Sequence, residues 1–87
     1  MKLSQQKKDK ISEQILSYLY HAYPKSSFTA EIAKELARDE EFIKSLMFEL
    51  KRKNLVVSIN KNPDGINYVR RIRWRLSNSA YSAYKSL

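Results

Sequence analysis

The sequence predicts a mostly helical α+β fold for this chain of 87 residues. Apolar residues recur at helical spacing through the first half of the chain, and the period then changes to two, as in β-strands. A turn sequence, Asn62-Pro63-Asp64-Gly65, divides the period-two region into the arms of a hairpin. A chain of this length supports one compact core. We therefore expect a single domain over residues 1–87, in which residues 1–8 are a candidate disordered basic arm.

The first predicted helix covers residues 4–22. Its apolar side chains repeat at intervals of three and four, which places them on one helix face: Ile11, Ile15, Tyr18, Leu19 and Ala22. Leu16 and Tyr20 widen this face, so the helix is expected to contact more than one neighbour. Pro24 ends the helix because the residue before a proline avoids the α conformation.

Two shorter helices follow. The helix over residues 30–37 has Thr29 as its expected N-cap, because a threonine hydroxyl accepts a hydrogen bond from a first-turn N–H. The helix over residues 40–53 has Asp39 as its expected N-cap and Asn54 as a left-handed terminator. Its inward face consists of Ile43, Leu46, Met47 and Leu50.

The hairpin is expected to have one apolar face and one arginine face. In its first arm, Val57 and Ile59 alternate with polar residues, which places them together on one face. Residues 26–28 are a candidate third strand, and Ser77 is the expected N-cap of a short terminal helix. In the second arm two sets of side chains alternate: Ile72, Trp74 and Leu76 on one face, Arg71, Arg73 and Arg75 on the other.

The chain carries a formal net charge of +8, and this charge is concentrated at its two ends. Residues 1–25 hold five lysines and two carboxylates, residues 26–54 hold six groups of each sign, and residues 55–87 hold six basic groups against Asp64 alone. A small basic domain indicates a polyanionic partner, most often a nucleic acid. Arginine, which dominates the last third, donates paired hydrogen bonds to phosphate.

The composition excludes several other functions. The sequence has no cysteine and only one histidine, His21, so it predicts no disulfide, no metal site and no cofactor. Its one glycine rules out a glycine-rich phosphate loop, and no nucleophile has a plausible base partner, so we expect no enzymatic activity. Without a membrane span or a secretory signal in the sequence, a cytoplasmic location is expected.

Two motifs together carry a resemblance to a known family. The first is Ile32-Ala33-x-x-Leu36-x-x-Asp39-x-x-x-Ile43-x-x-x-Met47-x-x-Leu50-x-x-x-Asn54-Leu55-Val56, and the second is Arg73-Trp74-Arg75-Leu76-Ser77-x-x-Ala80. In this order they resemble the helix-turn-helix and the strand-to-helix junction of MarR-like and PadR-like winged helix-turn-helix regulators. The resemblance covers residues 10–87. It implies a three-helix core, a β-hairpin wing and binding to double-stranded DNA.

The sequence departs from this family at the turn between its second and third helices. The family usually has glycine near Ala37 and an apolar residue near Arg38. The helix expected to be the recognition helix also opens with three carboxylates, Asp39, Glu40 and Glu41, where such helices normally approach the major groove.

The outer face of the third helix supplies the candidate base-reading residues Lys44, Ser45 and Arg52. Phe48 lies on the same face and has two interpretations. It contacts a thymine methyl group, or it packs against protein and remains partly exposed.

The hairpin supplies the candidate phosphate-binding residues. Arginines at a wing tip can enter a narrow minor groove, and arginines at alternate strand positions are about 7 Å apart, near the spacing of phosphates on one strand. The alternative is that these arginines pair with carboxylates of the middle third. The candidates are Lys61, Asn62, Asn67, Arg70, Arg71 and Arg73.

Four tyrosines, Tyr18, Tyr20, Tyr81 and Tyr84, are expected to join the first and last helices, within one chain or across a homodimer. Stacking on single-stranded bases is the alternative. The function predicted is a small DNA-binding transcription regulator in which the wing and the N-terminal lysines bind phosphate. The alternatives are a protein-interaction module that uses Phe48 and the acidic start of the third helix, and an RNA-binding winged helix.

Overall fold

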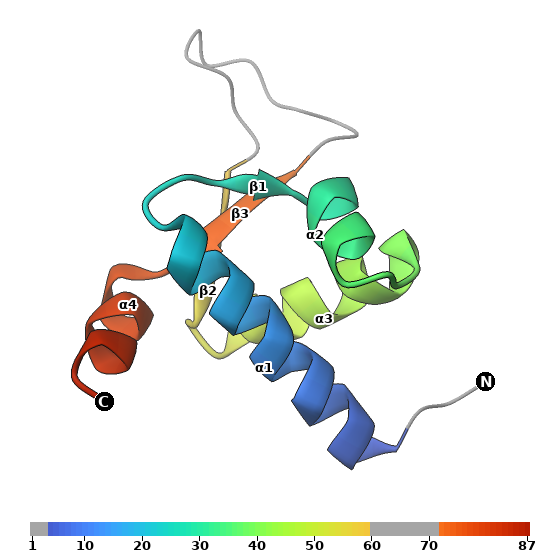
Figure 1. Cartoon of the computed structure of the whole chain (residues 1–87), viewed down its shortest axis with the longest axis horizontal. Coiled ribbons are helices and arrows are strands. Elements are labelled where there is room, and N and C mark those ends of the chain that lie inside the picture. The colour runs from blue at the N-terminus through green and yellow to red at the C-terminus, as the bar shows by residue number, and fades with distance from the viewer. Residues whose placement is uncertain (1–3, 60–71) are drawn as a thin grey trace, which may run out of the picture.

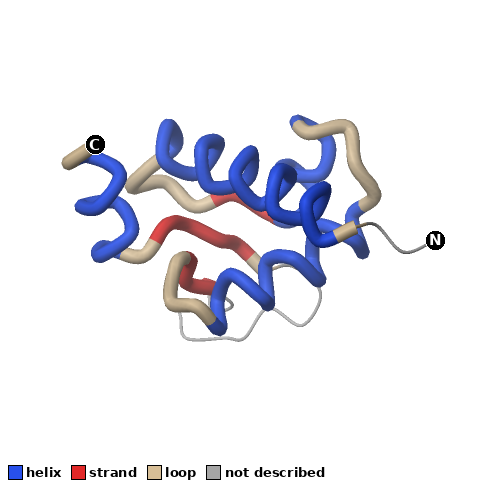
Figure 2. Tube along the Cα trace, turned by 90° about the horizontal axis from the view of Figure 1, so that it is seen from below, coloured by secondary structure: helices blue, strands red, loops and turns tan. Residues whose placement is uncertain are grey.

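The computed structural model describes residues 4–59 and 72–87 of the chain. Figure 1 shows that α4 lies apart from α2 and α3, near the C-terminal end of α1. Figure 2 gives the same arrangement from below, with the N-terminal end and α4 at opposite ends of the molecule. In order, the elements are α1 (Gln5–Ala22), β1 (Ser27–Phe28), α2 (Thr29–Glu35), α3 (Glu40–Arg52), β2 (Val56–Ile59), β3 (Arg73–Leu76) and α4 (Asn78–Lys85).

The core lies between the first three helices and the sheet. α1 packs against β3 and α3, α2 packs against α3, and α3 packs against β2. The helix faces predicted from the apolar spacing are the faces that are buried. The largest fully buried side chains are Trp74, Ile15, Leu19, Ile32, Ile43, Leu46, Met47, Leu76 and Val56.

The start of α1 corrects one expectation. Ser4 caps the helix, and its hydroxyl oxygen accepts a hydrogen bond from the backbone N–H of Lys7 at 3.3 Å. Residues 5–8 therefore belong to α1 rather than to a disordered arm. The amphipathic spacing begins only at Ile11, so the first turn carries no apolar signal and depends on the serine cap.

The three strands form an antiparallel sheet in the order β1-β3-β2. The candidate strand at residues 26–28 is confirmed as β1, in which Ser27 lies opposite Trp74 and Phe28 opposite Arg73. Trp74 and Leu76 are fully buried, as the alternation predicted.

The prediction that Val57 and Ile59 lie on the apolar face of the hairpin is wrong. Val56 lies opposite Leu76 and is buried, whereas Val57 and Ile59 lie opposite Arg75 and Arg73. Residues directly opposite one another in an antiparallel pair share a face, so Val57 and Ile59 lie on the arginine face. Two valines in succession, Val56 and Val57, precede Ser58. Alternation of apolar and polar residues therefore does not determine which valine points into the core.

Thr29 is not the N-cap of α2. The helix begins at Thr29 itself, and the N–H of the capping residue, Phe28, donates to Glu31 Oε1 at 2.8 Å. The Thr29 hydroxyl instead accepts a hydrogen bond from Trp74 Nε1 at 2.8 Å inside the protein. A buried indole N–H needs a partner, and this tertiary requirement outweighs the local capping preference.

α2 also ends earlier than predicted, at Glu35. Ala37 takes a left-handed conformation with φ of 53°, and the N–H of Arg38 bonds to the carbonyl of Ala33 at 2.9 Å. This is the Schellman geometry in which glycine is preferred, because a Cβ in the left-handed region costs about 1 kcal/mol. The chain therefore forms with alanine a turn in which glycine is preferred.

The remaining helix ends follow the predictions. The Asp39 carboxylate accepts the N–H of Phe42 at 3.0 Å, and the Ser77 hydroxyl accepts the N–H of Ala80 at 3.1 Å. Asn54 ends the segment after α3 in the left-handed conformation, with φ of 61°.

Replacing Thr29 with valine tests the importance of its bond to Trp74. We expect the free energy of unfolding to fall by about 1–3 kcal/mol, because the valine leaves the buried indole N–H without a partner. Urea unfolding followed by the fluorescence of the single tryptophan measures the change. Thr29→Ser keeps the hydroxyl and is the matched control. Equal stability of the two variants would contradict this role.

Candidate nucleic-acid interface

The outer face of α3 carries the predicted base-reading residues. Ser45 and Arg52 are exposed, and Lys44 is half-buried. The Ser45 hydroxyl donates to the carbonyl of Phe42 at 2.7 Å, one turn earlier in the same helix. Since the opposite face of α3 is buried in the core, these side chains point away from the protein body.

Phe48 lies on this outer face but also touches the core. Its side chain is 40% exposed, and its ring meets the fully buried ring of Trp74 edge to face, with 5.4 Å between the centroids. This contact supports protein packing for one side of the ring. The exposed side remains next to Ser45 and Arg52, one helical turn away in either direction.

The first turn of α3 is acidic and open to solvent. Glu40 and Glu41 are exposed, while the Asp39 carboxylate is occupied by its capping hydrogen bond. Carboxylates are favoured at the positive end of a helix, which accounts for this composition without a ligand. An acidic turn also repels phosphate, so any nucleic acid on α3 must lie mainly along its later turns.

The two described arginines of β3 differ in their surroundings. Arg73 is half-buried, and its guanidinium lies 5.8 Å from the centroid of the Phe28 ring. Arg75 donates from Nη1 to the carbonyl of Leu76 at 2.9 Å and to Asn78 Oδ1 at 3.4 Å. Arg75 therefore connects β3 to the start of α4, through a carbonyl and an amide rather than a carboxylate.

The other predicted wing residues lie outside the described part of the chain. Their assignment to phosphate binding stays a prediction from the sequence. They are Lys61, Asn62, Asn67, Arg70 and Arg71.

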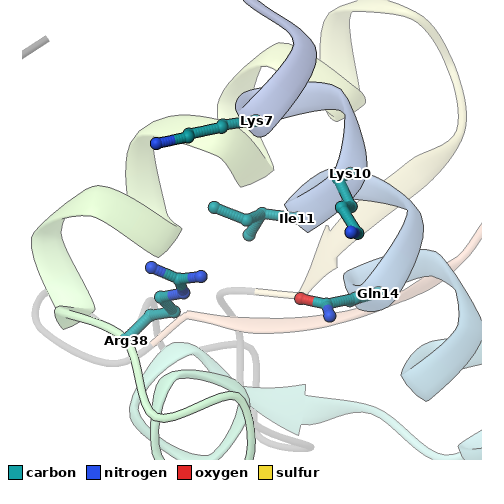
Figure 3. Close-up of a pocket in the computed structure, with 5 residues that line it drawn as sticks. All are labelled: Lys7, Lys10, Ile11, Gln14 and Arg38. Carbon is teal, nitrogen blue, oxygen red and sulfur yellow. The ribbon is translucent and has the colours of Figure 1, made fainter. Parts of the chain in front are cut away.

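The sequence analysis assigned phosphate binding to the N-terminal lysines but missed Arg38, which the structure places beside two of them. A groove of about 400 Å³ lies between the first half of α1 and the turn that joins α2 to α3. Figure 3 shows Lys7 and Arg38 extending into the same space from opposite sides of Ile11. Arg38 lies in the electrically neutral middle of the sequence, so only its departure from the family's apolar residue gave a signal. We call this site the basic groove; its lining residues are Lys7, Lys10, Ile11, Gln14 and Arg38.

The tyrosines join α1 to α4 within one chain. The Tyr20 ring stacks on the Tyr81 ring, with 5.3 Å between the ring centroids. Its centroid lies 5.7 Å from that of Tyr84. Tyr23, which the sequence analysis did not include, stacks on Tyr81 at 3.9 Å. Tyr18 faces elsewhere, with its hydroxyl 3.5 Å from that of Ser27.

The described residues contain neither a membrane-spanning helix nor a cluster of metal-binding side chains. No helix in this part of the chain has both the length and the apolar character needed to cross a membrane. Within residues 4–59 and 72–87, no three acidic, histidine or cysteine side chains are grouped so as to hold a metal ion.

Comparison with solved structures identifies the fold. MepR of Staphylococcus aureus, solved as a DNA complex, aligns with 87% of this chain and 52% of its own, with 25% identity and a TM-score of 0.71. MepR in its DNA-binding conformation aligns with 88% of this chain and 53% of its own, at the same identity and TM-score. A mutant of Lactococcus lactis ZitR in apo form aligns with 93% of this chain and 56% of its own, with 22% identity and a TM-score of 0.71.

This chain is a winged helix. MepR and ZitR are MarR-family winged-helix transcription regulators. The two sequence motifs of this chain resemble those of the same family. In this winged helix, α2 and α3 form the helix-turn-helix, and β2 and β3 are the strands that flank the wing. The chain spans about half the length of the solved structures that it matches. No family model and no curated protein matches it.

Replacing Phe48 with alanine separates its two interpretations. We expect the free energy of unfolding to fall by about 1–2 kcal/mol, because the edge-to-face contact with Trp74 is lost. Thermal or urea unfolding measures this change, and Ser45→Ala is an exposed control on the same face. A fully stable Phe48→Ala variant would show that the ring serves only a partner.

Proposed function

We propose that this winged helix binds double-stranded DNA and acts as a transcription regulator. The observation that carries the proposal is the likeness to MepR, which has been solved on DNA, over 87% of this chain. The net charge of +8 and its concentration in the last third of the sequence support it independently. The proposed role requires no cofactor and no catalytic residue, and it places the protein with the chromosome, in the cytoplasm of a cell without a nucleus.

Within this proposal, α3 reads bases and the wing binds the backbone. Lys44, Ser45 and Arg52 are the proposed base-reading residues, because they lie on the outer face of α3 beyond its acidic first turn. Arginine reads guanine in the major groove through two parallel hydrogen bonds. The wing residues proposed to contact phosphate are Lys61, Asn62, Asn67, Arg70, Arg71 and Arg73.

A homodimer through α1 and α4 is part of the proposal. In the described structure, Tyr20, Tyr81 and Tyr84 pack within one chain, so they fix the position of α4 relative to α1. A second copy would then meet a preformed surface of these two helices. Sedimentation at high micromolar concentration tests the dimer, and DNA binding does not depend on it.

DNA binding is expected to depend strongly on salt. If about six phosphates are contacted, the logarithm of the binding constant falls with the logarithm of salt concentration at a slope near −5. Electrophoretic shifts with random and genomic duplexes at two salt concentrations measure the slope. Failure to bind any duplex at low salt would overturn the proposed function.

Two arginine variants distinguish the helix from the wing. Arg70→Ala should weaken binding to all duplexes and flatten the salt slope by about one unit, because it removes one phosphate contact. Arg52→Ala should weaken binding and also reduce the preference for one sequence, because it removes a base contact. If Arg70→Ala has no effect while Arg52→Ala is severe, the proposed docking surface is wrong even though the fold is correct.

A protein-interaction module is the second candidate, and one observation favours it. The exposed part of Phe48 and the exposed carboxylates of Glu40 and Glu41 lie on the same helix, α3. Replacing both glutamates with glutamine should tighten non-specific DNA binding if they lie near phosphate. Unchanged DNA affinity together with loss of a protein partner would favour the second candidate.

A further inference from the structure

We propose that the basic groove binds a phosphate of the DNA backbone, as an anchor separate from the wing. This inference rests on the proposed function and adds a contact site to it. The groove joins the first half of α1 to the residue that precedes the N-cap of α3, so it connects the helix-turn-helix to the N-terminal end of the molecule.

The charge of the groove is not balanced by protein groups. Lys7, Lys10 and Arg38 line it, and its lining includes no carboxylate. Within the described residues, these three side chains form no hydrogen bond or ion pair. Like charges that share a groove repel one another, and an anion placed between them relieves this repulsion. The two carboxylates adjacent to these cations in sequence have other partners: Asp9 accepts a hydrogen bond from Gln5 Nε2 at 2.8 Å, and Asp39 accepts one from the N–H of Phe42 at 3.0 Å.

The shape and chemistry of the groove favour a backbone phosphate over a small organic ligand. Ligand pockets are mostly apolar and enclose most of their ligand. Here Ile11 is the one apolar residue of the lining. Only 3% of its surface is exposed, so it offers a ligand little apolar contact area. Gln14 adds an amide that donates hydrogen bonds, and Lys7, Lys10 and Arg38 are all exposed side chains. Such a site suits an anion that remains partly in water, as a DNA phosphate does.

The groove also explains how α3 can approach DNA despite its acidic first turn. Arg38 is only two residues from Glu40 and three from Glu41 along the chain. A phosphate held by the groove lies on the α1 side of this turn, where three cations offset the repulsion by the two glutamates. The groove then holds the backbone on the α1 side of the acidic turn, which leaves the later turns of α3 to meet the DNA.

The test compares two double variants that remove the same charge. Lys10→Gln with Arg38→Gln removes two of the three positive charges of the groove. Lys25→Gln with Lys85→Gln is the control, because Lys25 follows the far end of α1 and Lys85 lies in α4. All four side chains are exposed, and circular dichroism and thermal unfolding verify that both variants fold like the wild type.

The readout is the salt dependence of binding to a random and a genomic duplex. The groove variant should flatten the salt slope by about one unit, because one phosphate contact is lost, and weaken binding to both duplexes about tenfold at fixed salt. The control should leave the slope at the wild-type value. Equal effects of the two variants would overturn this inference while wild-type binding upholds the proposed function. Failure of the wild type to bind any duplex would overturn both.

A second measurement distinguishes a backbone phosphate from a free anion. Inorganic phosphate is titrated into the wild type and the groove variant, and the backbone amide signals of α1 are followed by NMR. Weak, unsaturated shifts up to millimolar phosphate are expected, because one phosphate without the rest of the duplex has few contacts. Saturable binding of inorganic phosphate, lost in a groove variant whose DNA affinity is unchanged, would overturn the assignment to DNA.

Discussion

The hydrogen bond from the Trp74 indole to the Thr29 hydroxyl connects the sheet to the helix-turn-helix. Trp74 is completely buried, and an unpartnered N–H in that position would destabilise the fold. The bond fixes β3 against the start of α2, Ser27 pairs with the same tryptophan in the sheet, and Phe48 brings α3 onto its ring. The position of the outer face of α3 relative to the wing strands therefore depends on one side chain.

Sequence reasoning succeeded where a local interaction determines the structure. Asp39 and Ser77 cap their helices because the preference depends on bonds within one turn. It failed at Thr29, since the competing partner lies 45 residues away, and at Val57, since neighbouring apolar residues leave the inward phase of a short strand undetermined. Both errors arise from tertiary contacts that no local pattern contains.

The candidate site divides in the same way. The outer face of α3 was predictable, because helical spacing alone separates Ser45 and Arg52 from the buried stripe. The basic groove was not, because Lys7 and Arg38 are about 30 residues apart and meet only when α1 packs beside the turn after α2. Residues 26–54 have a net charge of zero, because six carboxylates balance Arg38 and the five other basic groups, so the charge of this segment gave no sign of a basic site.

The attachment of α4 has a consequence for the motions of the molecule. Its eight residues bury only Ala80, and stacked tyrosines and the Ser77 cap hold the rest in place. A unit with so little buried surface opens at a lower free energy than the core does. Amide hydrogens of α4 should therefore exchange with solvent through local opening, whereas those of α1 and α3 exchange only when the whole core unfolds.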